Sequence, residues 1–308
     1  MTTYPTPVKE RTLTADEVHQ FLRSPALVAR RMQEMTDLSF VADLLLTGSA
    51  DATGTGAIMV EEDDALFLDD KPEFIAPGGE YPLITADEVG ASLIAIRKKG
   101  FDSEITDEKI ARTPGDTLRK LLAKMANTMV ADFDSVALAV VASKVTGTYA
   151  ASGTWDDGGR IIDDILMADA TEDEKERGYS YNAVVLRPTD YAKVVANLIK
   201  SNMMPRESGN PLLANGARSF DFMGKRIIKS VRTPFTDPLL IDTTNLGGIA
   251  TENIGSPGYA RTQGGIEVKT WRPAARDDND SWRVRNRRVA VPYVTGPGAS
   301  VRITGTKA

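Results

Sequence analysis

A long amphipathic helix is the feature that most constrains how this chain can fold. Apolar residues recur at spacings of three and four over residues 117–143, which is the period of one buried helix face; they are Leu118, Leu121, Leu122, Met125, Met129, Phe133, Val136 and Val140. Pro114 and Gly115 precede this segment, and Asp116 is the expected N-cap. At ~1.5 Å per residue the helix is roughly 40 Å long, so we expect a spine on which other elements pack. Its polar face is expected to be open to a partner, through Arg119, Lys120, Lys124, Asp132 and Asp134.

An acidic stretch, residues 51–88, precedes the spine. It holds one base, Lys71, against eleven acids: Asp51, Glu61, Glu62, Asp63, Asp64, Asp69, Asp70, Glu73, Glu80, Asp87 and Glu88. Two extended limbs, residues 58–68 and 73–84, are separated by Pro72. Their apolar residues alternate but are too few to fold against one another. The pattern predicts a hairpin-like loop that packs on another subunit, with contacts from Glu61, Glu62, Asp63, Asp64, Phe67 and Phe74.

Bases gather instead in the last fifth of the chain. From Arg261 onward they outnumber the acids, and they are densest in the run Arg283, Arg285, Arg287 and Arg288. One interpretation is two solvated faces of opposite sign. The other is complementary contact between copies of the chain, in which the acids at residues 61–64 of one copy meet Arg285, Arg287 and Arg288 of another.

The composition excludes several classes of function. The chain has no cysteine and a single histidine, His19, so disulfides, thiolate chemistry and the common zinc sites are not expected. A net charge of −6 argues against a protein whose main task is wrapping nucleic acid. No apolar run approaches ~20 residues, and residues 1–10 lack the features of a signal peptide. We therefore expect no metal, no cofactor and no membrane.

Other patterns predict the remaining elements. Thr14 and Glu17 form a capping box that opens a helix toward Arg31, interrupted near Pro25. A strand is expected over residues 89–99, and a strand over 183–186 passes at Pro188 into a helix through Asn197. Residues 220–231 read as a hairpin turning at Gly224. Further strands are expected over residues 239–242, 266–271, 282–294 and 300–304.

In this order, the parts resemble the major capsid protein of tailed bacteriophages, a Hong Kong-type capsid fold shared with encapsulins and the herpesvirus capsid floor. The resemblance covers residues 40–303. It rests on the extended loop at 58–84, the segment 100–108 before the spine helix, the strand-then-helix at 183–191, the hairpin at 222–228, the strand at 238–242 and the run ending at Tyr293.

The resemblance implies an α+β fold with an N-terminal arm (1–50), an extension loop (51–88), a peripheral domain with the spine helix (89–147 and 262–308) and an axial domain (148–261). It implies a major capsid protein that self-assembles as hexamers and pentamers into an icosahedral shell around double-stranded DNA. The expected partners are other copies, a separate scaffolding protein, a portal and decoration proteins. Assembly is expected in the host cytoplasm, and the product is the virion capsid.

Three other functions fit parts of the sequence. An encapsulin-like compartment around a cargo enzyme shares the fold, but the long N-terminal arm argues against it. An enzyme would use carboxylates such as Asp156 with Asp157, Asp163 with Asp164, or the cluster at 277–280 to hold a hard cation; paired acids on turns are more often solvated. A nucleic-acid-binding module would use the run at 283–288, in a chain that is acidic overall.

Overall fold

The computed structural model describes residues 14–36, 40–62, 90–201, 219–262, 264–273 and 280–307. The chain forms two compact units. Unit 1 comprises Met1–Phe40, Arg97–Asp132 and Glu252–Ala290, and unit 2 comprises Val41–Ile96, Phe133–Thr251 and Val291–Ala308. The helix α5 (Pro114–Lys144) and the strand β13 (Ser281–Val294) each contribute residues to both units. The domain boundaries expected from the sequence stay predictions.

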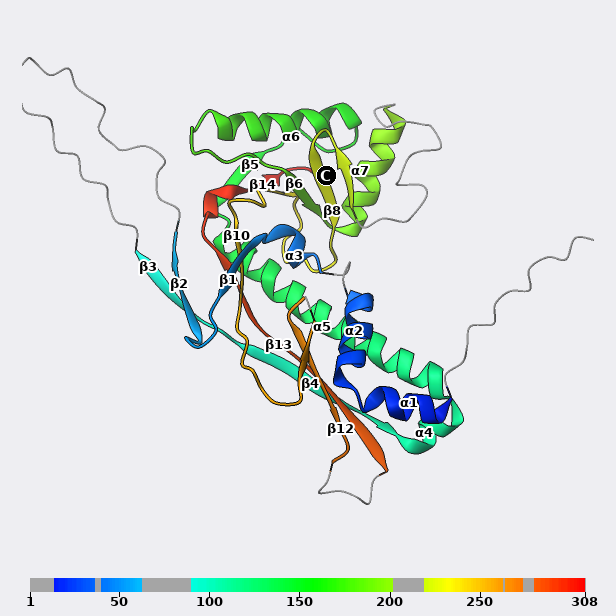
Figure 1. The fold of residues 1–308 in the computed structure, drawn as a ribbon. Helices are drawn as coiled ribbons and strands as arrows, with labels where there is room; N and C mark the ends of the chain where they lie inside the picture. Colours follow the sequence, from blue (N-terminus) through cyan, green and yellow to red (C-terminus); the bar gives the residue numbers. More distant parts are fainter. Residues whose placement is uncertain are drawn as a thin grey trace, which may run out of the picture. The chain divides into compact units, whose positions relative to one another are not determined.

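Unit 1 begins with two short helices (Figure 1). In α1 (Ala15–Leu22) the backbone N–H of Glu17 donates to Oγ1 of Thr14 at 3.3 Å, and the Thr14 N–H donates to Oε2 of Glu17 at 2.9 Å. This confirms the predicted capping box. The helix α2 (Pro25–Thr36) starts at Pro25. Proline suits the first position of a helix, because the N–H that it lacks would have no partner within the helix there. The predicted interruption near Pro25 is also confirmed.

The sheet of unit 1 is antiparallel and centres on β13. One side of β13 pairs with β4 (Lys98–Thr106) and the other with β12 (Ile266–Trp271), which pairs in turn with β11 (Ala260–Arg261). The helix α2 packs on β11 and β12, and α4 (Asp107–Arg112) follows β4. The strand expected over residues 89–99 was wrong in its bounds. Its residues divide between β3 (Ala91–Ala95) and β4, since Ile96 and Arg97 lie between the two strands.

The spine helix α5 is present but begins at Pro114, two residues before the predicted N-cap. Asp116 therefore lies in the first turn, where its charge suits the helix dipole. Leu118, Leu122, Met125, Met129 and Phe133 are buried as predicted, whereas Leu121, Val136 and Val140 are only half-buried. A straight helix has 3.6 residues per turn, so its buried side drifts over 31 residues. By length and composition alone, helix α5 is long and apolar enough to cross a membrane, and half of its most apolar stretch is buried within the described structure.

One side chain of α5 has a role that the sequence did not indicate. Asp134, predicted to lie on a polar face open to a partner, is 4 % exposed. Its Oδ2 accepts the N–H of Val41 at 3.2 Å and its Oδ1 accepts the N–H of Ala42 at 3.0 Å. These donors open the short helix α3 (Ala42–Leu45), so within unit 2 the carboxylate of Asp134 serves as the N-terminal cap that α3 lacks in its own sequence.

The larger sheet of unit 2 has six strands. Their order is β5 (Gly147–Ala150), β14 (Ser300–Thr304), β9 (Leu239–Ile241), β6 (Ala183–Leu186), β8 (Lys225–Lys229) and β7 (Ser219–Phe222). The helices α6 (Gly158–Asp173) and α7 (Pro188–Lys200) pack on each other and on this sheet. Tyr181, Ile165, Val194, Leu198 and Val184 belong to the shared core. The predicted hairpin at Gly224 and the strand-to-helix passage at Pro188 are confirmed.

Two further strand pairings lie in unit 2. Parallel strands β1 (Gly48–Asp51) and β10 (Gly247–Thr251), of which β10 also neighbours β13, approach so closely that a Cβ on Gly248 would lie 2.3 Å from the carbonyl oxygen of Gly48. Only glycine fits there. Strands β2 (Ala57–Glu61) and β3 form an antiparallel hairpin base. A single 3-10 turn, Pro297–Ala299, leads into β14.

Candidate assembly interface

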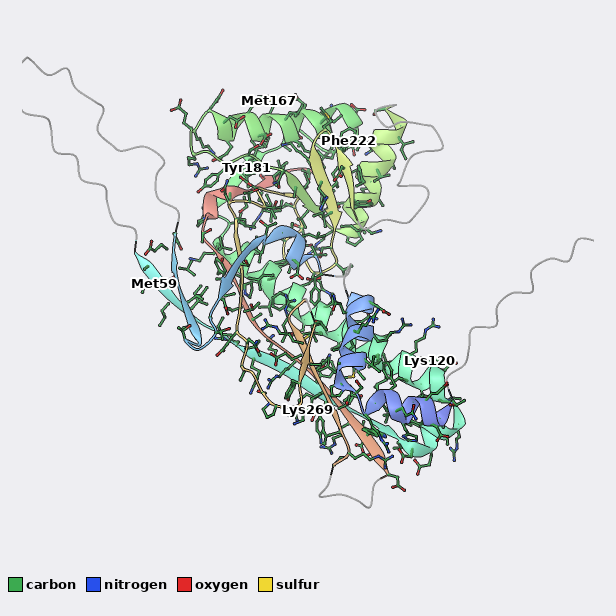
Figure 2. The ribbon with its side chains drawn as sticks, in the orientation of Figure 1. Met59, Lys120, Met167, Tyr181, Phe222 and Lys269 are labelled. Carbon is green, nitrogen blue, oxygen red and sulfur yellow. The ribbon has the colours of Figure 1, made fainter. Side chains whose placement is uncertain are left out.

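The hairpin base carries an apolar face that nothing in the described part of the chain covers. Met59 on β2 and Leu93 on β3 are directly opposite each other in the pairing, and they are 70 % and 75 % exposed. Figure 2 labels Met59 on this hairpin. Successive residues of a strand point to opposite faces, so Ala57, Ala91 and Ala95 share the face of this pair.

The other face of the hairpin is partly covered. Val60 is 4 % exposed, and Ile58 and Ile94 are half-buried. Glu61, exposed at the end of β2, belongs by the same alternation to the face of Met59. On the covered face, Glu62 accepts an ion-pair hydrogen bond from Nζ of Lys144 at the end of α5. The hairpin is therefore anchored on one side only, and its Met59 and Leu93 side is left open.

The remaining predicted contacts of the loop, Asp63, Asp64, Phe67 and Phe74, lie outside the described residues. Their contact with a neighbouring subunit stays a prediction.

Arg285, by contrast, has partners within unit 1. Its Nε and Nη2 donate to the two carboxylate oxygens of Asp102 on β4, at 2.5 and 2.7 Å. This two-pronged bond holds the pKa of Asp102 below its ordinary value and raises that of Arg285. The guanidinium also lies 5.0 Å from the ring centre of Trp271, a cation–π distance.

The next arginine, Arg287, is more deeply enclosed. It is 8 % exposed and pairs with the buried Glu267 across the β12–β13 ladder at 2.6 Å. Its guanidinium lies 3.7 Å from the ring centre of Tyr259. Lys269, labelled in Figure 2, lies on this sheet. Its Nζ is 5.5 Å from the ring centre of Tyr259 and 5.8 Å from that of Trp271, so this face of the sheet alternates cations with aromatic rings.

Arg288 points to the opposite face of the sheet. It shares that face with Val284 and Asn286, is 5 % exposed, and lies 4.6 Å from the ring centre of Phe40. Successive residues of a strand face opposite sides, so the sequence pattern could have indicated that Arg288 lies on the other face from Arg285 and Arg287. Because all three arginines already have partners in their own unit, their predicted contact with the acids of another copy stays a prediction.

In each carboxylate pair proposed as a cation site, one member has a local structural role. Asp164 is fully buried, and its two oxygens accept from Nε1 of Trp155 at 2.8 Å and from the Ser152 N–H at 2.9 Å. Asp157 caps α6 by accepting from the Gly159 N–H at 3.1 Å. Within the described residues, no group of three or more potential ligands is arranged to hold a metal ion. Of the cluster at 277–280, only Asp280 is described.

Comparison with known proteins places this fold. The model of the phage capsid protein family matches residues 88–303, and a search of curated proteins finds no match. A virus-like particle from Pyrococcus furiosus is similar in structure, with a TM-score of 0.57, 12 % identity, and coverage of 90 % of this chain and 97 % of that one. A protein of Mycobacterium phage Bobi gives a TM-score of 0.57 at 13 % identity, covering 86 % and 90 %.

The capsid of Cyanophage P-SCSP1u gives a TM-score of 0.55 at 13 % identity, covering 84 % of this chain and 86 % of that one. These likenesses establish the fold, and the family match covers more than half of the chain. The match supports a capsid subunit over the alternative of an encapsulin-like compartment. The chain therefore belongs to the phage capsid protein family, as a major capsid protein of the virion shell with the Hong Kong-type fold.

Proposed function

We propose that copies of this chain assemble as hexamers and pentamers into an icosahedral shell that encloses the double-stranded DNA of a tailed phage. Repeated contacts between two different surfaces of one chain close into rings, and this role requires no catalysis and no cofactor. Assembly takes place in the host cytoplasm, with a separate scaffolding protein, a portal and decoration proteins as further partners. The shell holds the DNA without reading its sequence.

The exposed pair of Met59 and Leu93 is the observation that carries this proposal. A two-stranded hairpin is at best marginally stable in water, and it gains stability by covering an apolar face. The part of the chain that the structure describes leaves this face open. In the proposed shell, a neighbouring subunit covers this face and also contacts the loop of residues 63–89 that joins the two strands.

The test replaces both residues with glutamine in one variant, Met59→Gln with Leu93→Gln. Because both side chains are solvent-exposed in the subunit, the unfolding free energy should change by less than ~0.5 kcal/mol. Assembly should fail, as measured by negative-stain microscopy and sedimentation. Val231→Gln is the matched control, because Val231 is equally exposed, at 77 %, and lies outside the hairpin.

Shells of normal size and yield from the double variant would contradict the proposed role of the hairpin. A wild-type chain that forms neither capsomers nor particles, even with its scaffolding protein, would contradict the proposed function itself.

A further inference from the structure

Two helices of unit 2 present exposed faces that complement each other in charge. On α6, Leu166 and Met167 are 42 % and 50 % exposed. Asp163 lies one turn before them and Asp173 lies two turns after, and both are exposed. Residues three and four apart lie on the same helix face, so α6 carries a short apolar stripe between acids. Its one base is Arg160 in the first turn.

The exposed face of α7 has the opposite sign. Ala192, Ala196 and Ile199 follow one another at spacings of four and three and are all exposed, Ile199 by 39 %. Lys193 and Lys200 flank this stripe on the same side and are exposed as well. The one acid of α7, Asp190, is held by Lys307 at 2.7 Å. The outer face of α7 is thus an apolar stripe bordered on one side by two bases.

The turn between β7 and β8 extends the α6 face. Met223 is 57 % exposed and has φ 51°, and Gly224 follows at φ 76°. A two-residue hairpin turn with both φ values positive favours Asn-Gly, and a non-glycine residue there is strained. The sequence thus keeps an apolar side chain exposed at a position where asparagine would fit with less strain.

The hollow between Met223 and Leu166 measures about 10 Å³, room for no more than a water molecule, so a small organic ligand does not fit this face. A partner with a surface of its own is required. A capsid protein meets many copies of itself, and the face of α7 offers an apolar stripe to cover that of α6 and bases to pair with its acids.

We infer that α6 of one subunit, with the Met223 turn, packs against α7 of a second subunit in the assembled shell. This inference rests on the proposed shell function. The contact joins two different surfaces, so it propagates from copy to copy, and it forms a ring where the rotation between neighbouring copies closes. The acids and bases select the partner face and its register, as complementary charges do across protein interfaces.

Charge reversal tests the contact. One variant carries Asp163→Lys with Asp173→Lys on α6, and a second carries Lys193→Glu with Lys200→Glu on α7. Each should raise the subunit concentration needed for particle formation at least tenfold while leaving the melting temperature of the unassembled subunit within a few degrees of wild type. Combining the two pairs should restore assembly to within about threefold of wild type.

A matched control separates local contact from net charge. The α6 variant is combined with Arg30→Glu and Lys109→Glu, two exposed bases of unit 1 that lie outside the spine helix. This variant has the same net charge as the α6–α7 combination and should stay defective. Rescue by both combinations, or by neither, would overturn the inference, as would normal assembly of either single-helix variant. These outcomes require a wild-type chain that assembles, so they are distinct from failure of the proposed function.

Discussion

Replacing Asp134 by alanine tests whether a buried carboxylate of α5 holds the start of α3. The substitution leaves the N–H groups of Val41 and Ala42 buried without their acceptor. Each such group costs ~1–3 kcal/mol, and removing a buried charge offsets part of that loss. We expect the free energy of unfolding to fall by ~2–4 kcal/mol, a large share of a typical total stability.

Asp132→Ala is the matched control, because Asp132 is the same residue type two positions away on the same helix. Its carboxylate is half exposed and pairs with Lys99 at 2.9 Å, a kind of ion pair worth ~0–1 kcal/mol. The assay is urea denaturation of unassembled subunits, followed by circular dichroism. A loss of stability equal to that of Asp132→Ala would refute the capping role of Asp134.

Two further predictions concern buried side chains, Phe133 and Glu172. Phe133→Ala should cost ~3–5 kcal/mol through lost burial and a residual cavity, whereas Lys124→Ala, on the exposed face of α5, should stay within ~0.5 kcal/mol; equal shifts in thermal unfolding would show that Phe133 is not a core residue. In unit 2, burial alone would raise the pKa of Glu172, but hydrogen bonds from Arg177 and Lys175 outweigh it and hold that pKa below its ordinary value. The ionised Glu172 with its two bases therefore stabilises the fold at pH values above the unfolded pKa of about 4.3. This contribution is lost as the pH falls through the lower pKa of Glu172 in the folded state. Glu172→Gln should be less stable than wild type at pH 7 and the gap should narrow toward pH 3, as measured by urea midpoints across pH; a gap independent of pH would contradict this linkage.

Local patterns in the sequence predicted the type of most elements and several of their bounds. The strands β6, β12 and β14 match the predicted ranges, and the capping box of Thr14 and the turn at Gly224 were read correctly. Each of these signals lies within a few residues of the element it defines. The order of these elements along the chain can be read from the sequence, and that order was enough to indicate the capsid fold.

The spine helix shows where local reasoning loses accuracy. Its existence followed from the apolar period, but its first residue and the burial of Leu121, Val136 and Val140 did not. The apolar period shows that one side of the helix is buried. It does not show which side faces other elements at each point along the helix. Small errors of angle per residue accumulate over a long helix, so its two ends bury different rows of side chains.

Partners of charged side chains were beyond the sequence. Arg285 bonds Asp102, which is 183 positions away, and Asp134 accepts from Ala42 across 92 positions. The sequence by itself determined the amphipathic helix, the strand alternation, the acidic loop and the basic C-terminal strands, since these depend on neighbours along the chain. Only the tertiary structure decided that Asp134 caps a helix, that Arg287 and Arg288 are buried, and that Met59 and Leu93 stay exposed, because burial and pairing depend on which distant segments the fold brings together.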